Sequence, residues 1–394
     1  MQEIKPLFIT ASSLVSPLGI GRDKTFDNLI AEKTGLSNDG FDGLGFDTWL
    51  GQVKQVEQVS LEPHLAHYNC RNNRLAKLGL DTDGFREAVL DLRQRYGASR
   101  IGVFVGTSTS GVQETELAYT QRDPANGQLP AQFDVSATHN IASLLQYVKA
   151  SLGLTGVGNA ISTACSSSAK VFASAHRYIQ AGLCDAAIVG GVDTLCLMTL
   201  YGFNSLQLVS PNLCQPWDQQ RCGINIGEGA GFAILETQAK GVVKLKGYGE
   251  SSDAYHMSTP HPEGVGAVMA MRTALQRAGL DSNNIDYINL HGTATPSNDR
   301  AEAQGLYTLF GDKILCSSTK GYTGHTLGAA GITEAIISML ALEHNTLPRN
   351  LNLSSPDPDL PVPVIDSTLS RPIEHVMTNS FGFGGSNCSL ILGW

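Results

Sequence analysis

The sequence predicts an α/β protein with largely parallel sheets, built as two domains or two fused halves. Short apolar runs typical of buried strands, such as residues 101–106 (IGVFVG) and 185–190 (DAAIVG), alternate with longer segments that have helical patterns. Strands that alternate with helices favour parallel pairing. A chain of 394 residues, of which 42% are apolar, is also longer than one hydrophobic core normally supports.

Composition narrows the class of protein. A formal net charge of −9 argues against nucleic acid as the main partner, because phosphates need a basic surface. The eight cysteines form no CxxC pair and no Cys/His spacing typical of zinc, which fits a reducing compartment. No apolar run is as long as a membrane-spanning helix, and the first residues lack a signal-peptide pattern. We therefore expect a cytoplasmic protein without a metal site and without membrane contact.

The N-terminal region contains the first candidate binding surface. A strand is expected at residues 6–14, a short helix at 23–32 and helical structure across 69–97. Arg71, Arg74 and Lys77 follow one another at spacings of three, which places them on one helix face. On an acidic protein this face is a candidate docking patch for an acidic carrier, and an ordinary solvated helix face is the equal alternative.

The remaining elements follow in order. After the strand at 101–106 comes a polar loop (TSTSG), a further loop or insertion at 120–134 and a helix at 137–152. Thr237–Gly241 is the best boundary in the chain, so we expect one half at residues 1–241 and a second at 242–394. The second half predicts strands and helices in the order strand 242–248, helix 267–278, strand 285–290, a helix from His325 to about Asn345, and a last strand at 388–392.

Cys165 stands where an apolar run stops and a helix rich in small residues, 166–180, begins. A thiol at a helix start faces unpaired N–H groups and the positive end of the helix dipole, which predicts a lowered thiol pKa and a larger thiolate fraction. For a lone cysteine, however, a buried structural role is the safer interpretation. The rest of the chain must supply catalytic partners.

Three segments offer such partners. His291 follows directly after a strand, where reactive groups of open α/β sheets gather. His325 stands just before a Gly/Ala-rich helix, whose N-terminus disfavours the protonated imidazole. Phe383 lies between two glycines in NSFGFGGSN, a loop whose backbone N–H groups can approach a substrate. Each feature alone has an ordinary structural explanation, but together a thiolate, two N–H donors and backbone amides make a carbon-acylating site.

The sequence resembles the β-ketoacyl-acyl-carrier-protein synthases of the thiolase superfamily. The segments that carry the resemblance cover most of the chain in the family's order: LVSPLG, STACSSS, PWDQQRCGINIGEGAG, SSDAYHMSTP, LHGTATPSND, SSTKGYTGHTLGAAG and NSFGFGGSN. The two histidine motifs indicate the elongating Cys-His-His type. The resemblance implies a five-layered αβαβα sandwich of two related halves that works as a dimer, either with itself or with a related chain-length subunit.

The resemblance also implies residue roles. Cys165 accepts the acyl chain from the phosphopantetheine of an acyl carrier protein, and the N–H groups of Cys165 and Phe383 form its oxyanion hole. His291 and His325 bind the malonyl thioester and stabilise the enolate formed on loss of CO2. Lys320 and Glu302 match a charged pair that orients the histidines, and Phe383 matches a gate. Asp299 matches a motif aspartate with a structural role.

Further positions are assigned to substrate binding. Ser258, Thr293 and Thr295 match hydroxyls that bind the pantetheine arm, and Thr109 lies near a position that closes the acyl pocket. Because Thr109 is smaller than Ile or Leu, a roomier tunnel for unusual acyl groups, such as polyenes or aryl-primed chains, is expected. The chain departs from the family at Lys170, where His is frequent, and at Cys222 and Ile224, where Asp and Phe are usual.

The expected function is decarboxylative Claisen condensation of a carrier-bound acyl chain with malonyl-acyl-carrier protein, in fatty acid or polyketide biosynthesis. No cofactor is expected beyond the carrier's phosphopantetheine. A subunit that shapes a tunnel for a catalytic partner is the first alternative, and the complete Cys165, His291 and His325 set argues against it. A degradative thiolase acting on coenzyme A is the second, and the double-histidine pattern argues against that.

Overall fold

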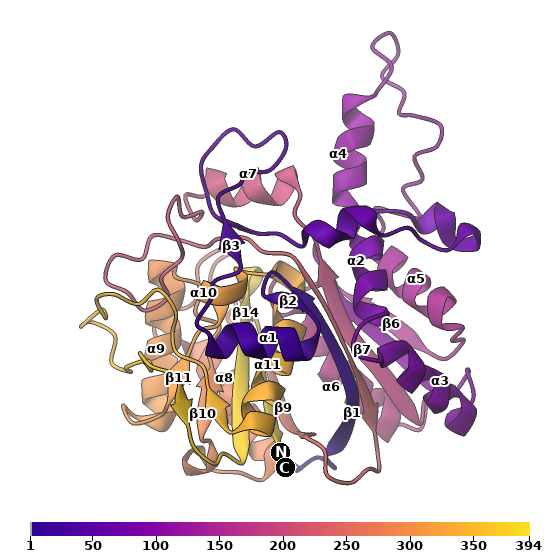
Figure 1. Ribbon diagram of the computed structural model, residues 1–394. Helices are drawn as coiled ribbons and strands as arrows, with labels where there is room; N and C mark the ends of the chain where they lie inside the picture. The colour runs from indigo at the N-terminus through magenta and orange to yellow at the C-terminus, as the bar shows by residue number, and fades with distance from the viewer. Residues whose placement is uncertain (1) are drawn as a thin grey trace.

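The computed structural model describes residues 2–394, in which eleven of the strands form one mixed sheet. Its main path runs β11-β10-β14-β15-β9-β1-β8-β7-β5-β6 (Figure 1). The bounds of these strands are β1 Leu7–Ser16, β5 Ile101–Gly106, β6 Gly158–Ile161, β7 Ala186–Asp193, β8 Gly229–Glu236, β9 Lys244–Ser252, β10 Tyr287–Asn289, β11 Cys316–Ser317, β14 His375–Gly382 and β15 Ser386–Gly393, with β2 Gly19–Ile20 paired to β1.

The expectation of largely parallel sheets is wrong for the centre of this sheet. Strands β6, β5 and β7 at one end and β14, β10 and β11 at the other are parallel. The central pairs β7–β8, β8–β1, β1–β9, β9–β15 and β15–β14 are antiparallel. Alternation of strands and helices predicted the parallel pairs at the two ends of the sheet. Antiparallel neighbours need no helix between them, so the same pattern could not predict the central pairs.

The strand order repeats in the two halves. Reading outward from the middle, β1-β8-β7-β5-β6 has the same chain-order sequence as β9-β15-β14-β10-β11. Within the sheet, β1 and β9 join the two groups through the pairs Leu7–Leu245 and Phe8–Lys244. Two similar five-stranded units with helices packed against them give the thiolase-like sandwich of related halves that the sequence predicted.

The middle layer consists of two buried helices, α6 (Ser167–Gln180) and α11 (Ala330–His344), which contact each other and the sheets of both halves. Their small residues let the backbones approach closely. A Cβ on Gly331 would lie 2.4 Å from the backbone nitrogen of Ala169, so only glycine fits there. This contact brings the first turns of both helices together.

The outer helices cover the faces of the sheet that point away from α6 and α11. Helices α2 (Arg71–Leu80), α3 (Phe85–Tyr96) and α5 (Ala142–Leu152) cover the N-terminal half, whereas α8 (Val265–Ala278) and α9 (Pro296–Phe310) cover the C-terminal half. Helix α5 begins at Ala142, five residues later than predicted, because the preceding residues form turns. The remaining helical segments are α1 Arg22–Ile30, α4 Val112–Thr120, α7 Leu197–Ser205, α10 Lys320–Thr323, η1 Lys54–Gln58, η2 Pro63–Tyr68, η3 Ser282–Asn284, η4 Leu327–Ala329 and η5 Phe383–Gly385; two small hairpins pair β3 Leu36–Ser37 with β4 Leu50–Gly51 and β12 Thr346–Leu347 with β13 Leu369–Ser370.

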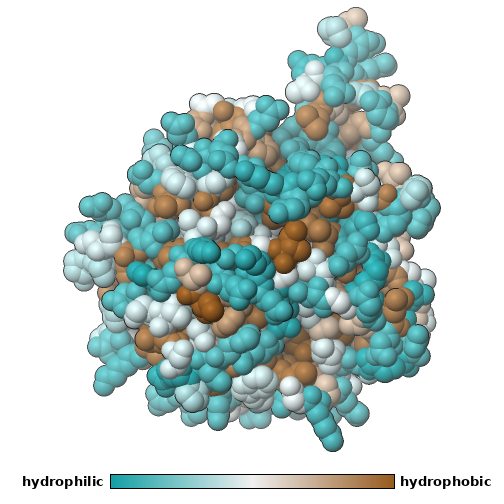
Figure 2. Space-filling view, in the orientation of Figure 1, coloured by the Kyte–Doolittle hydropathy of each residue, from teal (hydrophilic) through white to brown (hydrophobic). Residues whose placement is uncertain are grey.

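Helix α4 and the loop after it project from the body at the upper right of Figure 1. The face shown in Figure 2 is mostly hydrophilic, with apolar residues in small groups. None of the helices formed by residues 2–394 is both long and apolar enough to cross a lipid bilayer.

Candidate active site

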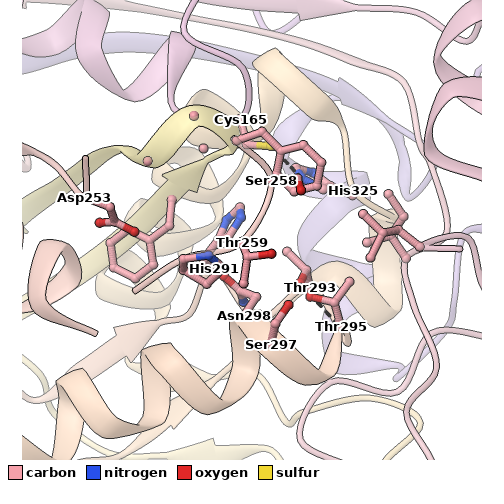
Figure 3. A pocket seen from close by; sticks show the side chains of 18 of the residues that line it. Cys165, Asp253, Ser258, Thr259, His291, Thr293, Thr295, Ser297, Asn298 and His325 are labelled. Atoms are coloured by element: carbon pink, nitrogen blue, oxygen red, sulfur yellow. Dashed lines mark hydrogen bonds between the residues drawn. The ribbon is translucent and has the colours of Figure 1, made fainter. Parts of the chain in front are cut away.

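A cavity between the two halves holds the residues that the sequence singled out. It is lined by the thiol-bearing turn before α6, the loops after β10 and β11, the segment after β9 and the Gly-rich loop between β14 and β15 (Figure 3). The lining includes the predicted residues Cys165, Ser258, His291, Thr293, Thr295, His325 and Phe383. Segments far apart in sequence therefore meet at one site.

Cys165 lies just before α6 and is 4% exposed. The preceding Ala164 has φ 52°, a left-handed conformation that is uncommon for a residue with a side chain. The turn is fixed from behind by Ser167, whose hydroxyl accepts a hydrogen bond from Thr163 N at 2.8 Å and donates to Ala164 O at 2.6 Å. A sharp, strained turn thus presents the thiol to the cavity.

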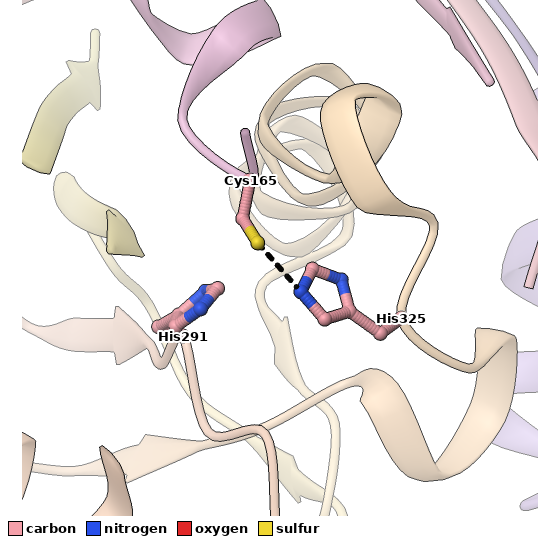
Figure 4. Close-up of side chains that lie close together, drawn as sticks. All are labelled: Cys165, His291 and His325. Atoms are coloured by element: carbon pink, nitrogen blue, oxygen red, sulfur yellow. Dashed lines mark hydrogen bonds between the residues drawn. The ribbon is translucent and has the colours of Figure 1, made fainter. Parts of the chain in front are cut away.

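His325 lies beside the thiol. Its Nε2 lies 3.0 Å from Cys165 Sγ (Figure 4), and its Nδ1 accepts a hydrogen bond from Leu327 N at 3.3 Å. A ring nitrogen that accepts from an amide carries no proton, so the proton of the neutral ring is on Nε2. His325 consequently directs an N–H donor at the sulfur and the space beside it.

His291 lies on the other side of the thiol, with its ring centre 5.4 Å from that of His325 and the two planes at 83°. Lys320 Nζ lies 3.4 Å from His291 Nδ1 and also donates to the backbone oxygen of His291. Because a lysine ammonium can only donate, His291 Nδ1 is the acceptor and Nε2 carries the proton. Both imidazoles therefore offer an Nε2–H donor.

The expected pairing of Lys320 with Glu302 is wrong. Lys320 pairs instead with Glu334 of α11, and both side chains are buried. Glu302 accepts backbone hydrogen bonds from His291 N at 2.9 Å and Gly292 N at 2.8 Å, so it holds the turn that bears His291. Burial raises the pKa of Glu302 to about 7, while these two N–H groups lower it.

The charge state of the site follows from burial. Desolvation, followed by the positive charge of Lys320, lowers the pKa of His291 and His325 well below the usual range, so both rings are neutral, as predicted for His325. Burial also raises the pKa of the Cys165 thiol to about 11, against the charge of Lys320 and the Phe383 N–H, which lower it. The expectation that the helix start alone lowers this pKa is wrong, because desolvation outweighs it.

The Gly-rich loop completes the site. The backbone N–H of Phe383 lowers the pKa of the Cys165 thiol, and the Phe383 ring lies 5.3 Å from that of Phe203 in α7. Lys170, one of the family departures, donates to Ser386 Oγ at 2.6 Å, and burial lowers the pKa of this lysine. Lys170 thus ties α6, the helix that follows Cys165, to the strand that follows the Gly-rich loop.

Most predicted substrate-binding residues line the cavity. Thr293 Oγ1 and Thr295 Oγ1 lie 2.9 Å apart, and Ser258 lines the cavity from the segment after β9. Thr109 does not line this cavity: it is buried, and its hydroxyl donates to Asp193 at 2.8 Å. The roomier tunnel inferred from Thr109 therefore has no support from this geometry. Asp299 accepts from Trp217 N and Ala294 N, which fits its expected structural role.

The proposed docking patch at α2 is not a free basic face. Arg71 is 4% exposed and pairs with Glu228 at 2.7 Å. Lys77 pairs with Glu62 and Asp81, and Arg74 lies 3.8 Å from Glu57. These acids come from other loops or from the end of the same helix, so the spacing of cations could not reveal them.

Reasoning from sequence missed two buried acids near the site. Glu334 is the partner of Lys320, and its signal is a lone acid within the otherwise apolar first turns of α11. Asp193 ends the buried strand β7. Both stand inside apolar runs, where an unpaired charge is costly, so each predicts a specific buried partner.

Cys165, His291 and His325 bring their potential ligand atoms within 4.8 Å of one another, the only such cluster of three found among residues 2–394. Sulfur and imidazole nitrogen suit zinc. However, both Nδ1 atoms already accept hydrogen bonds, and the protonated Nε2 atoms have no lone pair to offer. As arranged, this set donates hydrogen bonds.

Comparison with known proteins agrees with this geometry. Residues 77–241 match the family model "Beta-ketoacyl synthase, N-terminal domain", and residues 242–354 match "Beta-ketoacyl synthase, C-terminal domain". The chain is 32% identical to 3-oxoacyl-[acyl-carrier-protein] synthase 2 of Vibrio cholerae over 97% of both chains, and 30% identical to the Staphylococcus aureus (strain COL) protein of that name over 99% of both.

Solved structures give the same result. The ketosynthase ApeO in complex with its chain length factor ApeC, from Xenorhabdus doucetiae, superposes with a TM-score of 0.90 at 38% identity, covering 99% of this chain and 98% of the other. The ishigamide ketosynthase/chain length factor has a TM-score of 0.88 at 26% identity over 99% of both chains.

Proposed function

Because the chain belongs to the β-ketoacyl synthase family and catalyses condensation of a carrier-bound acyl chain with malonyl-acyl-carrier protein, we propose specific roles for the residues of the cavity. The observation that carries these roles is the convergence of one thiol and two Nε2–H donors, with 3.0 Å between Cys165 Sγ and His325 Nε2. The reaction has two steps.

In the first step, Cys165 Sγ attacks the carbonyl carbon of the acyl thioester. The new C–S bond forms as the bond to the phosphopantetheine sulfur breaks. The proton of the Cys165 thiol passes to the departing sulfur, which leaves as a thiol with the carrier. The negative charge on the carbonyl oxygen is stabilised by the N–H groups of Cys165 and Phe383, which face the sulfur in the free site. The acyl chain is then held on Cys165.

In the second step, the malonyl thioester oxygen accepts hydrogen bonds from His291 and His325. The C–C bond to the malonyl carboxylate breaks and CO2 leaves. The electron pair of that bond stays with the thioester and forms an enolate, whose charge the two Nε2–H groups stabilise. The enolate carbon attacks the acyl carbonyl on Cys165, and the thiolate departs. The product is a β-ketoacyl chain, two carbons longer, on the incoming carrier.

The substrate arm and the organisation of the chain follow from these roles. We propose that Ser258, Thr293 and Thr295 bind the pantetheine arm, and that the halves divide at residue 241, with the nucleophile in the first and both histidines in the second. The residues named supply the hydrogen bonds that stabilise charge in the two steps, and we propose no further cofactor. Cytoplasmic localisation fits carrier-bound substrates.

Partnership with a second chain is the remaining part of the proposal. Two of the similar structures are complexes of a ketosynthase with its chain length factor. Since this chain retains the thiol and both histidines, we propose that it is the catalytic member of such a pair, in a pathway with specialised acyl groups. A purely tunnel-shaping role would not require these residues.

The proposed roles are tested by measuring acylation and condensation separately. Intact-mass analysis follows acylation of the protein by acyl-carrier thioesters, and product analysis follows condensation after malonyl-acyl-carrier protein is added. Cys165→Ala should abolish both, whereas Cys222→Ala, which removes an exposed thiol, should change neither. His291→Ala and His325→Ala should keep acylation within about threefold and lower condensation roughly 10²- to 10³-fold. Condensation by Cys165→Ala would contradict the proposal.

A further inference from the structure

Asp193, the last residue of β7, is a buried carboxylate that the two-step mechanism does not use. Its side chain is 0% exposed. No lysine or arginine pairs with it in the part of the chain that the structure describes, residues 2–394. A buried charge without a counter-ion is costly unless hydrogen bonds satisfy it, so its surroundings indicate what it holds.

Six donor groups converge on the Asp193 carboxylate. Five come from the loop after β5: Thr107 Oγ1 at 2.7 Å, Ser108 N at 2.8 Å, Ser108 Oγ, Thr109 N at 2.9 Å and Thr109 Oγ1 at 2.8 Å. The sixth is Gly328 N at 2.5 Å, from η4 in the other half of the chain. The carboxylate therefore joins a loop of the first half to the turn that follows His325.

That turn controls the imidazole. The residue before Gly328 is Leu327, whose N–H donates to His325 Nδ1, and Leu327 has φ 51°. Two consecutive N–H groups thus have separate tasks: one binds Asp193 and the other binds the ring. If the Asp193 contact is lost, the strained turn is free to relax, and the hydrogen bond that keeps the His325 proton on Nε2 goes with it.

We infer that Asp193 is a positioning residue for condensation, which clamps the 326–328 turn so that His325 keeps its Nε2–H donor toward Cys165. The inference rests on the role proposed above for His325. Asp193 does not touch the thiol or the Phe383 N–H, so acylation does not depend on it. Condensation does, because it needs the His325 donor in place.

The packing at Gly328 supplies a second way to disturb the clamp. A Cβ on Gly328 would lie 2.6 Å from Asp193 Oδ2 and 2.8 Å from Ser108 N. Alanine at this position therefore pushes the turn off the carboxylate while leaving Asp193 itself intact. Asp218 supplies a matched control, because it is another fully buried carboxylate satisfied by backbone donors, from Gln220, Ser354 and Ser355.

The test measures acylation and condensation separately for Asp193→Asn, Gly328→Ala and Asp218→Asn in the full-length protein with its partner chain. For Asp193→Asn and Gly328→Ala, we expect acylation within about threefold of wild type, an unchanged KM for malonyl-acyl-carrier protein, and a condensation kcat lowered about 10- to 100-fold. Asp218→Asn should lower thermal stability and leave the ratio of the two rates unchanged. Imidazole ¹⁵N shifts should show the His325 proton on Nε2 in wild type and shared between the nitrogens in Asp193→Asn.

The inference is overturned if condensation by Asp193→Asn stays within threefold of wild type, or if both steps fall by the same factor. An unchanged His325 ¹⁵N pattern overturns it as well. Should Asp193→Asn fail to fold, Gly328→Ala decides by the same criteria. Failure of the underlying His325 role is recognised separately, because His325→Ala would then condense normally.

Discussion

The two imidazoles of the cavity, His291 and His325, take their proton positions from different neighbours. For His325 the neighbour is a backbone N–H two residues along the chain, and for His291 it is the ammonium of Lys320. Both arrangements leave Nε2–H directed at the same space, although the rings come from unrelated turns. Hydrogen-bond donors for an enolate are therefore present before substrate binds, so little reorganisation is needed during the reaction.

The reactivity of Cys165 should depend steeply on pH. Burial raises the pKa of this thiol to about 11, so the thiolate is the minor form at neutral pH and its fraction rises with pH until that pKa is reached. We expect inactivation by iodoacetamide to accelerate about tenfold for each pH unit between pH 7 and pH 9. The measurement is the rate of activity loss, with mass analysis confirming modification of Cys165.

A Lys320 variant provides a control for the pH dependence of inactivation. Lys320 lowers the Cys165 pKa, so Lys320→Met should make inactivation slower at each pH in this range. A rate that levels off below pH 8 would contradict the prediction and would mean that the helix start and the N–H donors outweigh desolvation.

The buried pair of Lys320 and Glu334 should behave asymmetrically under substitution. Glu334→Gln leaves the ammonium buried without a counter-charge, which is expected to cost about 3–5 kcal/mol of stability. The double variant Lys320→Met/Glu334→Leu should recover most of this loss, yet condense poorly because nothing then donates to His291 Nδ1. Thermal unfolding midpoints and condensation rates of the three proteins test this. Equal activity of the double variant and wild type would remove Lys320 from the positioning of His291.

At the scale of elements, the contact between α6 and α11 sets the distance between the thiol and His325. Gly331→Ala would place a Cβ 2.4 Å from Ala169 N, forcing the helices apart at a cost of about 1–3 kcal/mol and lowering activity. Gly202→Ala is the matched control, because Gly202 lies in α7 with no atom within 4 Å of an added Cβ. It should leave stability unchanged or raise it by about 0.5–1 kcal/mol. Similar melting temperatures for both variants would contradict the prediction.

Local patterns predicted some elements well and left others out for physical reasons. The helix of the nucleophile was expected at 166–180 and occurs at Ser167–Gln180, because its apolar face and its stop at Gly182 are local features. Helix α7 was not predicted, since its run LMTLYGFNS is apolar without helical periodicity. Its N-terminal amides are satisfied by Glu116 of α4, a partner 81 residues away that no local pattern reveals.

The residues of the site also fall into those that local sequence predicted and those whose contacts depend on tertiary packing. Strand ends and helix starts located Cys165, His291 and His325, because such positions are legible in a single sequence. The partners of Lys320, Arg71 and Thr109 are set by tertiary packing, and these are the contacts that were predicted wrongly. Spacing along the chain reports which residues share a face, but not which acid from another segment neutralises them.

At the scale of the whole molecule, the projecting segment formed by α4 and the loop after it is the part least explained by a single chain. Leu117, Tyr119 and Val135 on this segment are 52%, 54% and 53% exposed. Exposed apolar side chains on a projection are typical of a surface that another subunit covers. The occupant we expect is a second chain of the same fold.

Leu117→Asp should therefore weaken this assembly. A carboxylate placed in an apolar contact would be desolvated without a partner, so we expect the solution mass measured by light scattering to fall from that of a dimer toward that of one chain. Leu90→Asp on α3, where the leucine is 49% exposed but lies on the body of the protein, should leave the dimer intact. Identical masses for the two variants would show that the projecting segment is not the subunit interface.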